Sequence, residues 1–192
     1  MVDLNKYQKE VSLKDGTKIL LRPMVSEDMD ALHEFFKTVP KDELRYLRED
    51  VSSISVVRSW ADTLDYKRVL PILALKDGKI IGDATLHRRE FGWKWHVGMV
   101  RVFVHQDFRR IGLGHQMVEE IVVLARELGL EKLIAELPDI STPAINAFRK
   151  AGFGRAAVIP NLVKDRENRP VDVVVMTRDI KPAHDDEYDY DF

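Results

Sequence analysis

Two arginines and two glycines share the six-residue stretch "RRIGLG", residues 109–114, between a strand-like run and a long helical pattern. Gly112 and Gly114 lack side chains, so the backbone amides around them can approach an anion closely. Those amides belong to the first turn of the expected helix, where free N–H groups and the helix dipole favour negative charge. Arg109 and Arg110 add donors and positive charge beside them. The stretch predicts a diphosphate-binding loop; the alternative is an ordinary strand-to-helix turn with solvated arginines.

The surroundings of this stretch favour the diphosphate interpretation, because it follows a strand and opens a helix, as a phosphate site requires. The stretch has no Gly-Lys-Ser/Thr sequence, which argues against a nucleotide triphosphatase. It also lacks the three-glycine fingerprint of a Rossmann dinucleotide site. Two common kinds of nucleotide-binding loop are thereby disfavoured.

The composition predicts one domain without a bias toward nucleic acid. The chain has 192 residues, 45% of them hydrophobic, and a net charge of −2. It has no cysteine, which excludes disulfides, cysteine metal sites and thiol catalysis. The six histidines show no ligand spacing, and we expect no metal site.

The start "MVDLNKYQKE" lacks the apolar core of a signal peptide, and no apolar run approaches the roughly 18 residues of a membrane span. We therefore expect a cytoplasmic protein with no membrane or nucleic-acid partner.

The elements on either side of the loop are the clearest in the pattern. Residues 94–104 are almost continuously apolar, which predicts a strand buried on both faces. Apolar residues then recur at spacings of three and four over 117–128, and Gly129 ends the predicted helix. A strand over 131–137, a helix over 141–152 and two closing strands over 156–163 and 171–177 follow.

The N-terminal half predicts two hairpins and several helices. Asp15-Gly16 and Asp77-Gly78 are strong hairpin signals between strand-like runs. Ser26 is expected to cap a helix over residues 29–36, and two or three short helices are expected within 40–66. Together these elements predict one α/β domain over residues 1–181. The acidic tail, residues 182–192, has no apolar period and is expected to be disordered.

The segment "VRVFVHQDFRRIGLGHQMVEEIVVLARELGLEKLIAEL" resembles the acetyl-CoA-binding core of the GNAT N-acetyltransferases. In that family a strand ends in apolar-x-Val, and an Arg/Gln-x-x-Gly-x-Gly/Ala loop binds the coenzyme A pyrophosphate. "STPAINAFRKAGF" resembles the family's next helix, which ends in Lys-x-Gly-Phe, and "LRPMVSEDMDALHEFFKTVPKDELRYLRED" resembles the opening segment of the bacterial and archaeal protein lysine acetyltransferases. The resemblance covers roughly residues 16–180. It implies the GNAT fold, a mixed central β-sheet flanked by helices whose splayed parallel strands bind acetyl-CoA.

The resemblance also implies which residues contact the coenzyme. The strand Val102, Phe103 and Val104 would lie along the pantetheine as an added strand would, and one of its amides would polarise the thioester carbonyl. Ser141 stands where many relatives have a coenzyme-binding Asn, and Phe148 is also expected near the coenzyme. The pyrophosphate cradle is expected from Arg109, Arg110, Ile111, Gly112, Leu113, Gly114 and His115.

Two positions depart from the family pattern. Many GNAT enzymes have a Tyr shortly before Lys-x-Gly-Phe that can protonate the leaving thiolate, but this chain has Phe148, which has no proton to donate. Relatives in the lysine acetyltransferase branch often have a Glu early in the strand before the loop, and the matching residue is Met99. Neither familiar acid–base group is therefore at its expected place.

The reaction still needs a base, because lysine-type amines have pKa values near ~10.4. His96 is one candidate, since its position shares strand parity with Val102. Glu43, in the segment that often shapes the acceptor site, and Asp83, which follows Gly82 in a strand, are the carboxylate alternatives. Tyr46 is a candidate for the missing phenol. Each also has a purely structural interpretation, as a solvated residue or one at a strand edge or bulge.

The leading interpretation is transfer of an acetyl group from acetyl-CoA to a primary amine by direct attack. A protein lysine or N-terminal amine is the first acceptor class that the branch resemblance implies, and a small-molecule amine is the alternative. A coenzyme A-binding sensor module without efficient catalysis also stays open because both acid–base positions are altered, and a plain scaffold without a ligand is a third interpretation. GNAT proteins often pair through their C-terminal strands, and "VDVVVMT" is suited to such a homodimer.

Overall fold

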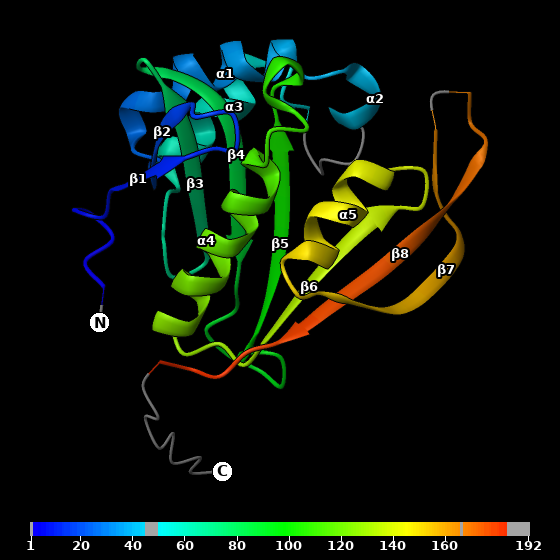
Figure 1. The fold of residues 1–192 in the computed structure, drawn as a ribbon. Helices are drawn as coiled ribbons and strands as arrows, with labels where there is room; N and C mark the ends of the chain where they lie inside the picture. The colour runs from blue at the N-terminus through cyan, green and yellow to red at the C-terminus, as the bar shows by residue number, and fades with distance from the viewer. Residues whose placement is uncertain (1, 45–49, 166, 184–192) are drawn as a thin grey trace.

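A mixed sheet of eight strands forms the centre of the computed structural model, which describes residues 2–44, 50–165 and 167–183. The strand order is β1-β2-β3-β4-β5-β6-β8-β7. Every neighbouring pair is antiparallel except β5 and β6, which run parallel (Figure 1). The strands are β1 (Lys9–Ser12), β2 (Lys18–Pro23), β3 (Val69–Lys76), β4 (Lys79–His87), β5 (Val97–Val104), β6 (Lys132–Pro138), β7 (Gly154–Lys164) and β8 (Pro170–Asp179).

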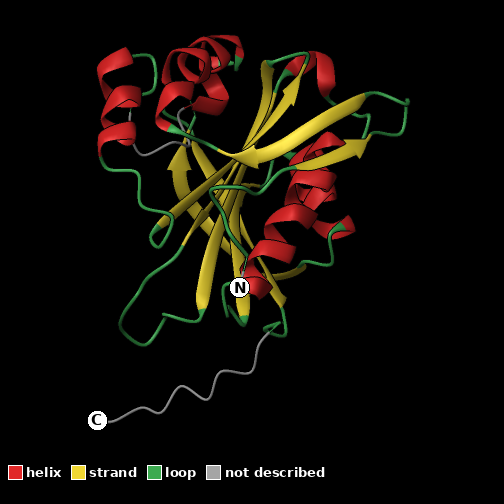
Figure 2. Ribbon diagram, turned by 90° about the vertical axis from the view of Figure 1, so that its left-hand side faces the viewer, coloured by secondary structure: helices red, strands yellow, loops and turns green. Residues whose placement is uncertain are grey.

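Helices cover both faces of this sheet (Figure 2). Helices α4 (Leu113–Glu127) and α5 (Thr142–Lys150) pack on one face, and α1 (Met29–Thr38) and α3 (Ile54–Asp62) pack on the other. Successive side chains of a strand point to opposite faces. Ile72 of β3 therefore joins the core under α4, and its neighbour Leu73 joins the core under α1. The short elements are η1 (Ser26–Asp28), α2 (Lys41–Leu44) and η2 (Gln106–Phe108). The mixed α/β architecture that the sequence predicts is confirmed.

Both predicted hairpins are present. Asp15-Gly16 connects β1 to β2, and Asp77-Gly78 connects β3 to β4. The turns use the left-handed region, with φ of 85° at Gly16, 50° at Asp77 and 76° at Gly78. Tight hairpin turns require such angles, which Gly, Asp and Asn tolerate best.

The expectation that Ser26 caps the first long helix is wrong. Ser26 begins η1, and Asp28 precedes α1. The Asp28 carboxylate accepts a hydrogen bond from the Val25 amide at 2.9 Å and two from the Arg22 guanidinium at 2.6 Å each. This bidentate ion pair with β2 sets how the chain enters α1.

We expect Asp28→Asn to lower the free energy of unfolding by about 3 kcal/mol at pH 7, because it leaves the half-buried Arg22 without its carboxylate. Burial alone would raise the pKa of Asp28, but the hydrogen bonds from Arg22 and Val25 outweigh it and hold this pKa below its usual range. The stabilisation is therefore present above the ordinary aspartate pKa of ~4 and is lost as the pH falls through the lowered value. Urea unfolding of the wild type and the variant at pH 7 and at pH 3 measures the difference in unfolding free energy. The same difference at both pH values would contradict the prediction.

Within the described residues, no helix combines the length and apolar character that crossing a membrane needs. Tyr46 and residues 184–192 of the expected tail lie outside the described residues. The single-domain boundary at residue 181 stays a prediction.

Candidate active site

β5 and β6 separate partway along their length and leave an opening in the sheet. They pair in parallel only from Val97 to Met99 on β5 and from Lys132 to Ile134 on β6. Beyond these residues β5 follows β4, whereas β6 follows β8 (Figure 1). The expected splay of parallel strands is thus confirmed. The expectation that residues 94–104 are buried on both faces is wrong, since only Gly98 and Val100 of this run are buried. Lys94 is exposed, and residues 101–104 are half-buried beside the opening.

The pairing of β5 with β4 decides which backbone groups face this opening. His105 donates its amide to the Ile81 carbonyl at 2.9 Å. In an antiparallel ladder, successive residues alternate between bonding to the partner strand and pointing away from it. The backbone groups of Val102 and Val104 therefore point to the open edge of β5. In agreement, the Val104 carbonyl accepts a hydrogen bond from Nε of Arg109 at 3.1 Å.

The start of α4 lies at the mouth of the opening. Gly112 precedes the helix with a φ of 96°, and Arg110 has a φ of 67°, both in the left-handed region. The first helical bond runs from Gln116 N to Gly112 O at 3.0 Å, so the amides of residues 113–115 precede the helical ladder. A Cβ on Gly114 would lie 3.6 Å from Val104 Cγ2 and 3.9 Å from the Cβ of Ala147 on α5. Among the described residues these amides have no hydrogen-bond partner, and the helix start stands between β5 and α5, the arrangement that an anionic group requires.

Two side chains of the loop have distinct surroundings. Besides its bond to Val104, Arg109 donates from Nη2 to a carboxylate oxygen of Glu43 on α2 at 2.8 Å. Arg109 thus ties the loop to the end of β5 and to the α1 side of the molecule. His115, in the first turn of α4, has a buried Nδ1 with no hydrogen-bond partner among the described residues. A phosphate oxygen is one group that would satisfy it.

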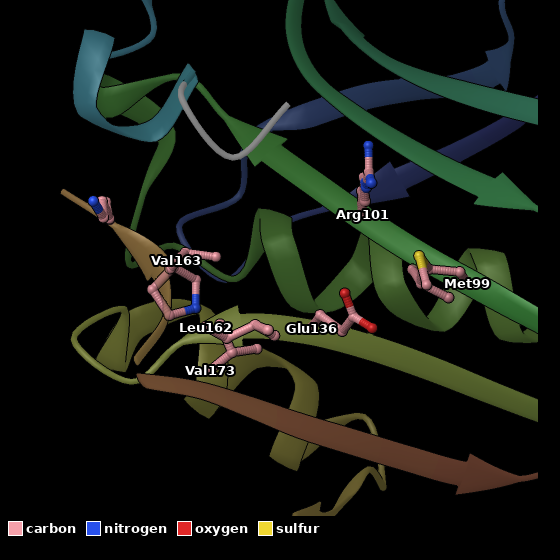
Figure 3. Close-up of a pocket in the computed structure, with 9 residues that line it drawn as sticks. Met99, Arg101, Glu136, Leu162, Val163 and Val173 are labelled. Atoms are coloured by element: carbon pink, nitrogen blue, oxygen red, sulfur yellow. The ribbon is translucent and has the colours of Figure 1, made fainter. Parts of the chain in front are cut away.

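A cavity of about 340 Å³ lies where the two strands diverge, and we call it the splay cavity. Met99 and Arg101 of β5 line it, together with Glu136 of β6 (Figure 3). Because Met99 pairs with Ile134, Glu136 shares a sheet face with Met99 and Arg101. Its exposed carboxylate points into the space between the strands. The other lining residues are Val100, Pro138, Leu162, Val163, Lys164 and Val173.

The sequence analysis missed Glu136. One signal was available, since "LIAELP" places a single charged residue inside an apolar strand. A strand that is covered on both faces would not hold an unpaired carboxylate, so its presence indicates a cavity or a surface. The direction of this side chain toward Met99 depends on the register of two strands that lie more than 30 residues apart in the chain.

A second cavity, of about 460 Å³, lies between the sheet and helices α1 and α3, and we call it the α1-side cavity. It borders Arg101, as the splay cavity does. Asp83 lines it and is 7% exposed. Both of its carboxylate oxygens accept only from the Thr85 hydroxyl, each at 3.3 Å, among the described residues. Burial raises the pKa of Asp83 to about 7, and the Thr85 hydrogen bond lowers it in part.

The other predicted site residues are dispersed. His96 lies just before β5, at the end opposite the loop; its carbonyl accepts from the Glu131 amide at 2.9 Å, and its ring contacts Trp95 edge-on. Ser141 precedes α5 and makes no side-chain cap bond. Phe148 is buried and packs edge-on against Phe153 at 5.0 Å. The expected roles of these residues stay predictions.

An open strand edge that leads from a helix N-terminus to a cavity in the sheet is the architecture of a transferase that binds a coenzyme A thioester. The family model of the acetyltransferase (GNAT) family matches residues 29–153. The chain belongs to this family of acetyl-CoA-dependent N-acetyltransferases.

Solved structures share the fold. The GNAT domain of S. lividans PAT is 21% identical, with a TM-score of 0.74, covering 90% of this chain and 97% of that one. Ribosomal-protein-alanine N-acetyltransferase from Brucella melitensis is 20% identical, with a TM-score of 0.71 and coverage of 83% and 99%. The structure of yncA from Salmonella typhimurium with its cofactor acetyl-CoA is 17% identical, with a TM-score of 0.71 and coverage of 88% and 98%.

Proposed function

We propose that this protein transfers an acetyl group from acetyl-CoA to a primary amine by direct attack, without a covalent enzyme species. The observation that carries the proposal is the open edge of β5, which joins the free amides of α4 to the splay cavity that holds Glu136. One end of this path suits a pyrophosphate, and the other suits a reacting carbonyl beside a carboxylate.

The free groups along this path fit the coenzyme. The pyrophosphate would accept hydrogen bonds from the amides of residues 113–115, and Nδ1 of His115 would gain a partner. The absence of a side chain at Gly114 leaves room between Val104 and Ala147. The pantetheine amides would bond to the backbone of Val102 and Val104 as a further strand would. Similarity to the yncA structure, which holds acetyl-CoA, supports this placement.

The thioester carbonyl would then lie near the splay cavity, where an amide of β5 can polarise it and stabilise the developing oxyanion. We propose Glu136 as the base that removes the proton from the attacking amine, directly or through one water. Its carboxylate opens into the cavity beside Met99, the position at which relatives in the lysine acetyltransferase branch often have a glutamate. Glu43 is already paired with Arg109, and His96 lies at the far end of β5. Because Phe148 cannot donate a proton, the thiolate would leave unaided or take its proton from water.

The acceptor belongs to one of two classes. The branch resemblance favours a protein lysine or N-terminal amine, and the α1-side cavity beside Arg101 favours a small amine. A pair of copies joined through the closing strands stays a prediction, as does the cytoplasmic location.

Turnover of acetyl-CoA with a panel of amines tests the proposal. We expect one free coenzyme A thiol to appear for each amine acetylated, measured with a thiol reagent and confirmed by mass spectrometry. The panel holds alkylamines, diamines, amino acids and lysine-containing peptides. If acetyl-CoA binds but no amine in the panel is consumed, the protein is a coenzyme A-binding sensor module instead.

A further inference from the structure

We infer that the α1-side cavity binds the body of the acceptor, and that this acceptor is a small diamine whose second ammonium group contacts Asp83. The inference rests on the proposed function for the reacting amine. For the second amine of the acceptor, the inference rests on the residues that line the α1-side cavity.

The first observation is the state of Asp83 in the fold. Its side chain is almost completely buried, yet the Thr85 hydroxyl is the one donor to it among the described residues, at 3.3 Å to each oxygen. Hydrogen bonds from hydroxyl groups are normally near 2.7–2.8 Å, so these two are weak. A buried carboxylate without a cation costs folding free energy, and its pKa near 7 reflects that cost. A ligand cation would supply the missing partner.

The second observation is the aromatic wall around this carboxylate. Phe36 meets Trp60 edge-on at 6.0 Å and Phe103 at 6.2 Å, and all three rings line the cavity. Leu32 and Leu64 complete an apolar surface. Aromatic rings attract ammonium groups, and apolar walls suit the methylene chain between two amines. Besides Asp83, the lining carries Asp65 as well as Arg68, Arg101 and His87, so the overall charge of the cavity does not favour a cation. The preference rests on the Asp83 carboxylate, which has no cationic partner among the described residues.

The third observation is the position of Asp83 relative to the splay cavity. Asp83 pairs with Phe103, and Arg101, two residues earlier on β5, borders both cavities. Strand geometry places Asp83 about 7 Å along the sheet from Arg101 and about 13 Å from Met99. Glu136, the proposed base, lies level with Arg101, because Met99 pairs with Ile134. One amine therefore cannot contact both Asp83 and Glu136, whereas the two nitrogens of a five-carbon diamine can. The cavity holds a second nitrogen of the same molecule.

The experiment compares cadaverine with pentylamine, which has the same chain and one amine fewer. We expect the wild-type protein to use cadaverine about 30-fold better in kcat/KM, the value of one charge-assisted hydrogen bond. Asp83→Asn should raise the KM for cadaverine about 30-fold and leave that for pentylamine within threefold. Glu90→Gln, which removes an exposed carboxylate beyond the end of β4, is the matched control and should change neither.

Calorimetric titration of each amine into the coenzyme A-bound protein makes the result independent of turnover. Cadaverine binding that is lost in Asp83→Asn supports the site even if no amine is acetylated, in which case the proposed function alone fails. Equal losses for both amines, or no preference for cadaverine in the wild type, would overturn the inference. Asp83→Asn should melt at the same or a higher temperature, because it removes an uncompensated buried charge. An unfolded variant would show that Asp83 is structural, and would also overturn the inference.

Discussion

Gly114→Glu is expected to weaken acetyl-CoA binding at least about 100-fold. Gly114 stands in the first turn of α4, and its missing side chain would point between Val104 and Ala147. A glutamate there would place a negative charge where the pyrophosphate approaches the helix amides. The loss of two charge-assisted hydrogen bonds at about 1.5 kcal/mol or more each corresponds to this factor. Calorimetric titration with acetyl-CoA measures the change.

Gly114→Ala is the matched control for this experiment. A Cβ at this position makes contacts of 3.6 Å and 3.9 Å, which are ordinary van der Waals distances, so the alanine variant should fold and bind. Gly112 is a poorer target, because any other residue is strained at its φ of 96°. A loss of binding in a Gly112 variant could then result from a folding defect. If the folded Gly114→Glu protein binds acetyl-CoA as tightly as the alanine variant, the pyrophosphate does not use this helix N-terminus.

Glu136→Gln is expected to lower kcat between about 100-fold and 1,000-fold at pH 7 and to leave the KM for acetyl-CoA nearly unchanged. The amide keeps the shape of the side chain but cannot accept the proton of the amine, and general bases typically contribute such factors. The deficit should shrink as the pH approaches ~10, because the amine then loses its proton to solvent. Initial rates between pH 7 and pH 10 test both parts.

Glu131→Gln is the control for Glu136→Gln, since Glu131 is an exposed carboxylate directly before the first residue of β6. It should retain full activity. If Glu136→Gln also does so, the base lies elsewhere, and His96, Glu43 and Asp83 become the variants to compare. A deficit that is constant across the pH range would mean that Glu136 positions the acceptor without removing its proton.

Local sequence determined the turns, the helices and the glycine-containing loop that precedes α4. Asp77-Gly78 forms its hairpin because the left-handed backbone angles of that turn favour these residue types. The apolar repeat before Gly129 forms α4, because its period matches the helix. Ser26 shows the limit of such signals. Arg22 on β2 takes Asp28 into an ion pair, and this tertiary contact decides how α1 begins.

Tertiary structure alone decided what stands around the proposed reacting centre. The apolar run 94–104 predicts a fully buried strand, yet β6 leaves β5 after Ile134, and the residues of β5 beyond Met99 become a partly open edge. Glu136 and Asp83 acquire their surroundings from strand register and from the helices packed on one face. Such contacts join residues far apart in the chain. The residue pattern of one segment shows the period and polarity of that segment. Which strand pairs with it, and in which register, depends on how all segments pack together.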